Sequence, residues 1–69
     1  MGDETLTRVL AGLQAHPHDD TPAAIAAQLG DLTRPNVEVA LRVLDTRGLV
    51  QQAGGHWQPT LRGWRAFRR

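Results

Sequence analysis

Apolar residues recur at helical spacing in three stretches of the chain before Gly48, and each stretch predicts one short helix. The first helix is expected from Asp3 to about Ala15, where four apolar residues form one stripe: Leu6, Val9, Leu10 and Leu13. Pro17 cannot continue a helix, so the polar residues 16–20 are expected to form a connector.

The second and third helices are predicted to flank a tight turn. Thr21-Pro22 starts the second helix, because Thr caps free N–H groups and Pro suits the first helical position. Gly30 suits the left-handed residue that ends this helix, and Leu32 is expected to pin the turn to the core. The third helix is expected from Arg34 or Pro35 to Thr46. The predicted inward residues are Ile25, Ala26 and Leu29 in the second helix and Val37, Ala40, Leu41 and Leu44 in the third.

A β-hairpin is predicted directly behind the third helix. Leu49-Val50 begins a strand, residues 53–56 form the tip, and Trp57 opens the return strand, which Pro59 keeps short or at an edge. Residues 60–69 are expected to add a helical turn or two, with three apolar side chains packing back: Leu61, Trp64 and Phe67. The expected fold is therefore α+β, one domain over residues 1–69 with three helices and a two-stranded hairpin, the order of parts in a winged helix-turn-helix.

Charge is unevenly distributed along the 69 residues. Residues 1–31 hold five acidic residues and one Arg, a net charge of −4, whereas residues 32–69 hold seven Arg and two acidic residues, a net charge of +5. This asymmetry favours a polyanionic partner for the second half. All the basic residues are Arg, whose planar fork of donors suits phosphate and guanine, although a preference for Arg codons explains the absence of Lys equally well.

Several motifs together resemble the winged helix-turn-helix families of the multiple-antibiotic-resistance regulator and arsenic-regulator type. The matching segments are Thr21-Pro22, Ile25-Ala26, Leu29-Gly30-Asp31-Leu32, the polar stretch Thr33 to Asn36, Val37, Leu41, Leu44, Gly48-Leu49-Val50 and Thr60-Leu61-Arg62-Gly63. The resemblance covers nearly the whole chain and implies a small DNA-binding transcriptional regulator. A weaker resemblance, through Gly48-Leu49-Val50, Gly54-Gly55 and Trp57, is to the winged-helix domain that ends the DNA-processing proteins of natural transformation.

The resemblance implies that the third helix lies in the major groove of double-stranded DNA. The best base contacts are Arg34 and Arg42, which suit guanine, and Asn36, which suits adenine, while Val39 suits a thymine methyl. The full expected interface is Thr33, Arg34, Pro35, Asn36, Val39, Arg42, Val43, His56, Arg62 and Arg65. Glu38 lies four residues from both Arg34 and Arg42, so ordinary surface ion pairs are the competing explanation.

Arg62, Arg65, Arg68 and Arg69 suit a phosphate-binding tail or, equally, a solvated C-terminus. Both Trp residues are expected in the core, with base stacking as the alternative role.

The alternative function is a protein-interaction module, and the chain is alternatively an excised domain of a larger protein. Val39 and Val43 lie one turn apart on the third helix and form a small apolar patch. The hairpin tip has no Arg or Lys, and His56 is the one residue near it that can carry a positive charge. Both features suit a protein partner. A homodimer is also expected, with the first helix and the C-terminal tail as candidate dimer surfaces.

Other function classes find little support in the residues. The chain has no Cys, no Ser and no Gly-rich phosphate loop after a strand, so neither an enzyme nor a cofactor is expected. His16, His18, Asp19 and Asp20 match no standard metal spacing, so no metal is expected. No apolar run approaches the roughly 20 residues that span a bilayer, and nothing resembles a signal peptide. A cytoplasmic location without membrane contact is therefore expected.

Overall fold

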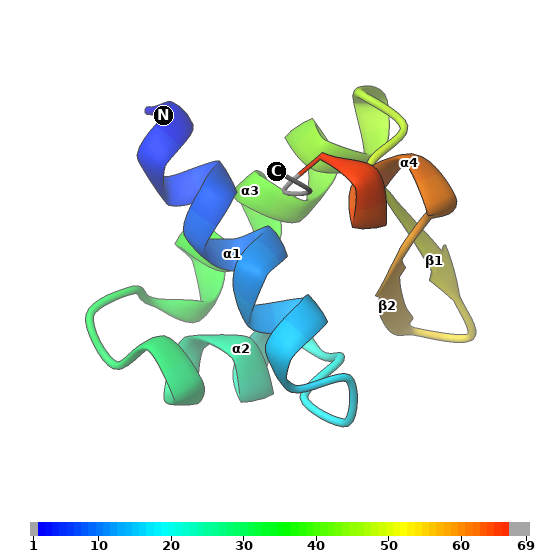
Figure 1. Cartoon of the computed structure of the whole chain (residues 1–69). Helices are drawn as coiled ribbons and strands as arrows, with labels where there is room; N and C mark the ends of the chain where they lie inside the picture. Colours follow the sequence, from blue (N-terminus) through cyan, green and yellow to red (C-terminus); the bar gives the residue numbers. More distant parts are fainter. Residues whose placement is uncertain (1, 67–69) are drawn as a thin grey trace.

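The structure, a computed structural model, describes residues 2–66. Within this range the elements are α1 (Asp3–Ala15), α2 (Pro22–Leu29), α3 (Arg34–Thr46), β1 (Val50–Ala53), β2 (His56–Pro59) and α4 (Leu61–Arg65). Figure 1 shows α1 crossing in front of α3, α2 beside their lower ends, and the two-stranded hairpin extending to one side. The α+β class is confirmed, but the described range contains four helices where three were expected.

One apolar core joins the first three helices to the hairpin. Its buried members include every residue of the predicted α1 stripe and of the inward arc of α3: Leu6, Val9, Leu10, Leu13, Ile25, Val37, Ala40, Leu41, Leu44, Val50 and Trp57. Ala26, Leu29 and Leu32 are partly buried against this cluster. The predicted core of the three helices and the predicted role of Leu32 in the turn are therefore confirmed.

The hairpin is antiparallel and ends in a two-glycine turn. Gly54 and Gly55 have φ angles of 59° and 83°, the left-handed values that a tight turn between two strands requires at both central positions. Val50 pairs with Pro59 and Ala53 with His56 at the two ends of the ladder. Both strands project away from the core, so only one side chain of each strand is buried: Val50 in β1 and Trp57 in β2.

Helix α4 folds back onto the start of the hairpin through its backbone. Thr60 N–H donates to the Leu49 carbonyl at 3.1 Å, and the Thr60 hydroxyl donates to the Gly48 carbonyl at 2.6 Å. The same hydroxyl caps α4 by accepting from Gly63 N–H at 3.1 Å. Gln14 of α1 holds the other side of this contact, donating from Nε2 to the Gly63 carbonyl at 2.9 Å.

The expected packing of Leu61 and Trp64 against the core is wrong. Leu61 is 67% exposed and Trp64 is 46% exposed. The reason is that Gly63, not an apolar side chain, faces inward, because a side chain there would collide with the Leu49 carbonyl. The closeness of the two backbones turns Leu61 and Trp64 outward. The expectation for Phe67 lies outside the described residues.

Candidate nucleic-acid interface

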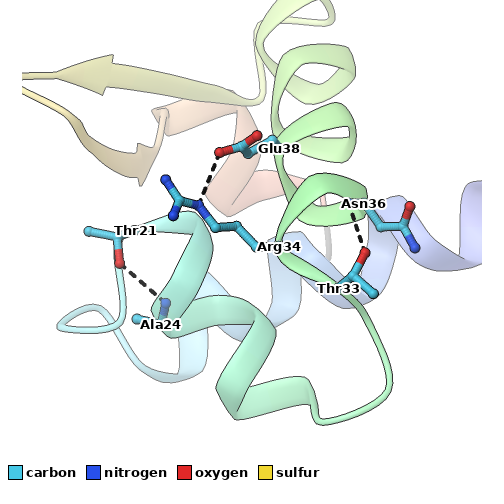
Figure 2. Close-up of polar contacts among 6 residues, drawn as sticks. All are labelled: Thr21, Ala24, Thr33, Arg34, Asn36 and Glu38. Carbon is cyan, nitrogen blue, oxygen red and sulfur yellow. Dashed lines mark hydrogen bonds and ion pairs between the residues drawn. The ribbon is translucent and has the colours of Figure 1, made fainter.

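The α2–turn–α3 segment is built from two helix starts of the same design. Thr21 Oγ1 accepts from Ala24 N–H at 3.2 Å and Thr33 Oγ1 accepts from Asn36 N–H at 3.3 Å, as Figure 2 shows. Each cap satisfies one of the N–H groups that the first turn leaves without an intrahelical partner. Between them, Gly30 ends α2 with a φ of 80°. The local sequence therefore sets the start of both helices.

The first turn of α3 carries the expected base-contacting side chains, but on two sides. Arg34 extends towards the side of α3 that faces the hairpin, where Nε donates to Glu38 Oε1 at 3.3 Å. Asn36 extends from the opposite side of the helix in Figure 2. The expected pairing of Glu38 with Arg34 is confirmed. Because Arg34 and Asn36 diverge, the structure does not bring these two candidate base contacts together.

The middle of the outer face of α3 carries one apolar and one basic side chain. Val39 is 50% exposed, and Arg42, three residues further along the helix, is also exposed. Within residues 2–66, Arg42 takes part in no ion pair, although Glu38 is four residues away. Val43 is only partly exposed, because it packs against the core. The expected Val39–Val43 surface patch is therefore reduced to Val39 alone.

The hairpin is anchored next to the start of α2. Trp57 N–H donates to the Asp20 carbonyl at 2.7 Å, and His56 Nδ1 lies 3.1 Å from Asp20 Oδ1. Asp20 immediately precedes the α2 cap, so these two contacts place the start of β2, next to the hairpin turn, beside the first turn of α2. His56 is thereby engaged with a carboxylate, and the hairpin face opposite Trp57 carries the uncharged side chains of Gln51 and Gln58, which pair across the two strands.

Arg62 of α4 lies at the opposite end of α3 from its first turn. The Arg62 side chain passes beside Gly48, just after the last residue of α3, since a Cβ at Gly48 would lie 3.8 Å from Arg62 Nη1. Arg34 is the first residue of α3, so the two ends of the helix are about 18 Å apart at 1.5 Å per residue. Arg62 and Arg65 are both exposed. They form a second basic group, and Arg68 and Arg69 lie outside the described residues.

Two further ion pairs hold basic side chains away from the candidate interface. Arg8 of α1 donates from both terminal nitrogens to the carboxylate of Asp31 in the α2–α3 turn, at 2.8 and 2.6 Å. This hydrogen bonding lowers the pKa of Asp31 and raises the pKa of Arg8. Arg47 Nη1 lies 3.7 Å from Asp3 Oδ1. Both pairs connect α1 to other parts of the fold, and no sequence pattern pointed to them.

The polar connector between α1 and α2 serves the fold. Asp19 accepts from Gln28 Nε2 at 3.1 Å, and Asp20 contacts the hairpin as described above. Within residues 2–66, no group of three His, Asp or Glu side chains is arranged to hold a metal ion. Two residues that sequence reasoning left out of the interface, Glu38 and Asp20, prove to contact the candidates Arg34 and His56. The four-residue spacing of Glu38 was the only sequence signal for either.

The chain was compared with known proteins by family, by sequence and by structure. No protein-family model, no curated protein and no solved structure matches it. In the described range, no helix is both long enough and apolar enough to cross a membrane. The function of the chain must therefore be inferred from its own residues.

Proposed function

We propose that the protein is a winged helix-turn-helix that binds double-stranded DNA through the outer face of α3. The observation that carries this proposal is the arrangement of two capped helices around a short turn, followed at once by a hairpin anchored beside α2. In helix-turn-helix proteins the second helix of such a pair lies in the major groove. An exposed face on α3 is a condition for that geometry, and this face is exposed at Pro35, Val39 and Arg42.

The positions of the basic side chains suggest two kinds of DNA contact, one inside the major groove and one with phosphates outside it. Arg42 stands in the middle of the outer face, where a helix in the major groove meets base edges and phosphates. Arg62 and Arg65 belong to α4, and the Arg62 side chain passes beside Gly48, at the opposite end of α3 from Arg34. Helix α3 itself is about 18 Å long, more than the roughly 12 Å width of the major groove. Arg62 and Arg65 therefore suit phosphates outside the groove. The resulting role is that of a small transcriptional regulator, acting on paired half-sites if it dimerises.

The test is fluorescence anisotropy of a labelled duplex of generic sequence, titrated with protein at about 50 and 200 mM salt, a range over which phosphate-driven affinity falls steeply. Arg42→Ala is expected to weaken binding and to lower the slope of log affinity against log salt by about one unit. Arg47→Ala is the matched control, because it removes the same charge from a side chain paired with Asp3.

Two results would contradict the proposal. The first is wild-type protein that shows no binding at the lower salt concentration. The second is equal loss of affinity in the Arg42 and Arg47 variants, which would mean that only net charge matters. Circular dichroism of each variant verifies that both remain folded.

Exposed apolar residues on α4 favour a second candidate function, contact with another protein chain. Leu61 and Trp64 are three residues apart and both project outward. Trp64 also borders an open hollow of about 230 Å³ with Pro17, Trp57 and Pro59. A second copy of the chain is the simplest partner, and sedimentation equilibrium of wild type and Trp64→Ala tests it. A wild-type protein that stays monomeric at all concentrations would remove the dimer from consideration.

A further inference from the structure

The way in which Glu38 contacts Arg34 leaves one particular edge of the guanidinium free. Glu38 Oε1 accepts from Nε, the nitrogen nearest the side-chain stem, at 3.3 Å. Among residues 2–66, neither terminal nitrogen of Arg34 has a hydrogen-bond partner. Figure 2 shows both terminal nitrogens pointing away from Glu38 and from α3. The contact therefore holds the stem of the group and presents its outer end.

The free end has the geometry of a guanine reader. The two terminal nitrogens of an Arg can donate together to guanine O6 and N7, the commonest specific contact in the major groove. An exposed Arg normally samples many rotamers, and fixing them reduces binding affinity. Glu38 limits those rotamers before DNA arrives, since it lies one turn further along the same helix and shares an ion pair with Arg34.

We infer that Glu38 is a positioning residue that orients Arg34 to read a guanine in the major groove. This inference rests on the proposed function and gives that function a base preference. The inferred role of Glu38 differs from the effect expected of an acidic residue near DNA. A carboxylate beside DNA repels phosphate and lowers affinity for every sequence, whereas a positioning carboxylate raises the discrimination at one base pair.

The experiment is selection of bound sequences from a random duplex library, followed by measurement of relative affinities for the best site and its single-base changes. Wild-type protein is expected to prefer guanine at one position, and Arg34→Ala is expected to lose that preference. Glu38→Ala is expected to reduce the same preference roughly two- to tenfold, the range for ordering one flexible side chain. Its affinity for random duplex is expected to be equal to or higher than that of wild type, because a negative charge is gone.

Glu38→Gln is the rescue variant, because its amide oxygen still accepts from Nε without carrying charge. It is expected to retain the guanine preference. The inference is overturned if Glu38→Ala keeps the full guanine preference, or if Glu38→Gln loses as much preference as Glu38→Ala. It is also overturned if the Glu38 variants lose a cytosine preference, which would show Glu38 contacting a base directly.

The same experiment distinguishes failure of the proposed function from failure of the inference about Glu38. Wild-type protein that selects no sequence and binds no duplex overturns DNA binding itself, and the inference falls with it. Binding with a guanine preference that depends on Arg34 but not on Glu38 overturns the inference alone.

Discussion

For the substitution Gly63→Ala, helix propensity and tertiary packing predict opposite effects on the stability of the protein. It lies inside α4, where replacing Gly by Ala favours the helix by about 1 kcal/mol. A Cβ built on Gly63 would collide with the Leu49 carbonyl oxygen and would lie only 3.0 Å from its carbonyl carbon. These atoms belong to the backbone, so no side-chain rotation relieves the overlap. Helix α4 must therefore move.

The contacts that α4 makes set the size of the effect. Moving α4 away from Leu49 disrupts three hydrogen bonds, those of Thr60 N–H, of the Thr60 hydroxyl to Gly48, and of Gln14 to Gly63. At a net value of about 1 kcal/mol each, their loss costs about 3 kcal/mol. After the gain in helix preference, Gly63→Ala is expected to destabilise the protein by about 2 kcal/mol. For a domain of this size that change lowers Tm by roughly 8–16 °C.

Urea unfolding followed by circular dichroism measures this difference. Gly12→Ala is the matched control, because Gly12 is also buried in a helix but its added Cβ would meet the Gln28 side-chain oxygen at 2.7 Å. That flexible side chain can turn away, so Gly12→Ala is expected to stay within about 1 kcal/mol of wild type. Stability of Gly63→Ala equal to or above that of wild type would refute the reasoning. Faster amide exchange at Thr60 would locate the damage in α4.

Two further predictions concern the α2–α3 turn. Because Arg8 lowers the pKa of Asp31, the pair stabilises the fold above the ordinary Asp pKa of 3.8, and this contribution disappears as pH falls through the lowered folded-state pKa. Asp31→Asn is therefore expected to flatten the acid limb of stability against pH below about pH 4, and high salt should reduce the difference; an unchanged limb in urea titrations would contradict this. Thr33→Ala removes the α3 cap and is expected to cost about 1 kcal/mol, whereas Thr33→Ser should retain most of it; equal losses in both variants would contradict a capping role.

Positions whose roles depend on near neighbours in the chain were predictable. The bounds of α1, α2 and α3, the two Thr caps and the glycine at the end of α2 all follow from contacts within about one helical turn. The two-glycine turn follows in the same way, because it needs positive φ at two adjacent residues. The inward arcs follow from the helical repeat, and burial of the apolar residues on them gives the core.

The candidate interface was only partly predictable, because the direction and exposure of its side chains depend on packing as well as on near neighbours in the chain. The sequence placed Arg34, Asn36 and Arg42 on α3, and it showed Glu38 at ion-pairing distance along the helix. It did not separate the two sides of the first turn, from which Arg34 and Asn36 point in opposite directions. It also grouped Val43 with Val39 on one surface, whereas packing against the apolar core partly covers Val43.

Tertiary structure alone decided the contacts between segments far apart in the chain. The pairs Arg8–Asp31 and Asp20–His56 join residues 23 and 36 positions apart, so their geometry exists only once the helices and hairpin have packed. The outward direction of Leu61 and Trp64 depends on one backbone approach, that of Gly63 to Leu49. A sequence pattern records how apolar a residue is, and here it determined the helices, the turns and the core. Which face of the short last helix meets the rest of the protein depends on the shape of the surface that receives it, and only the folded structure fixed that shape.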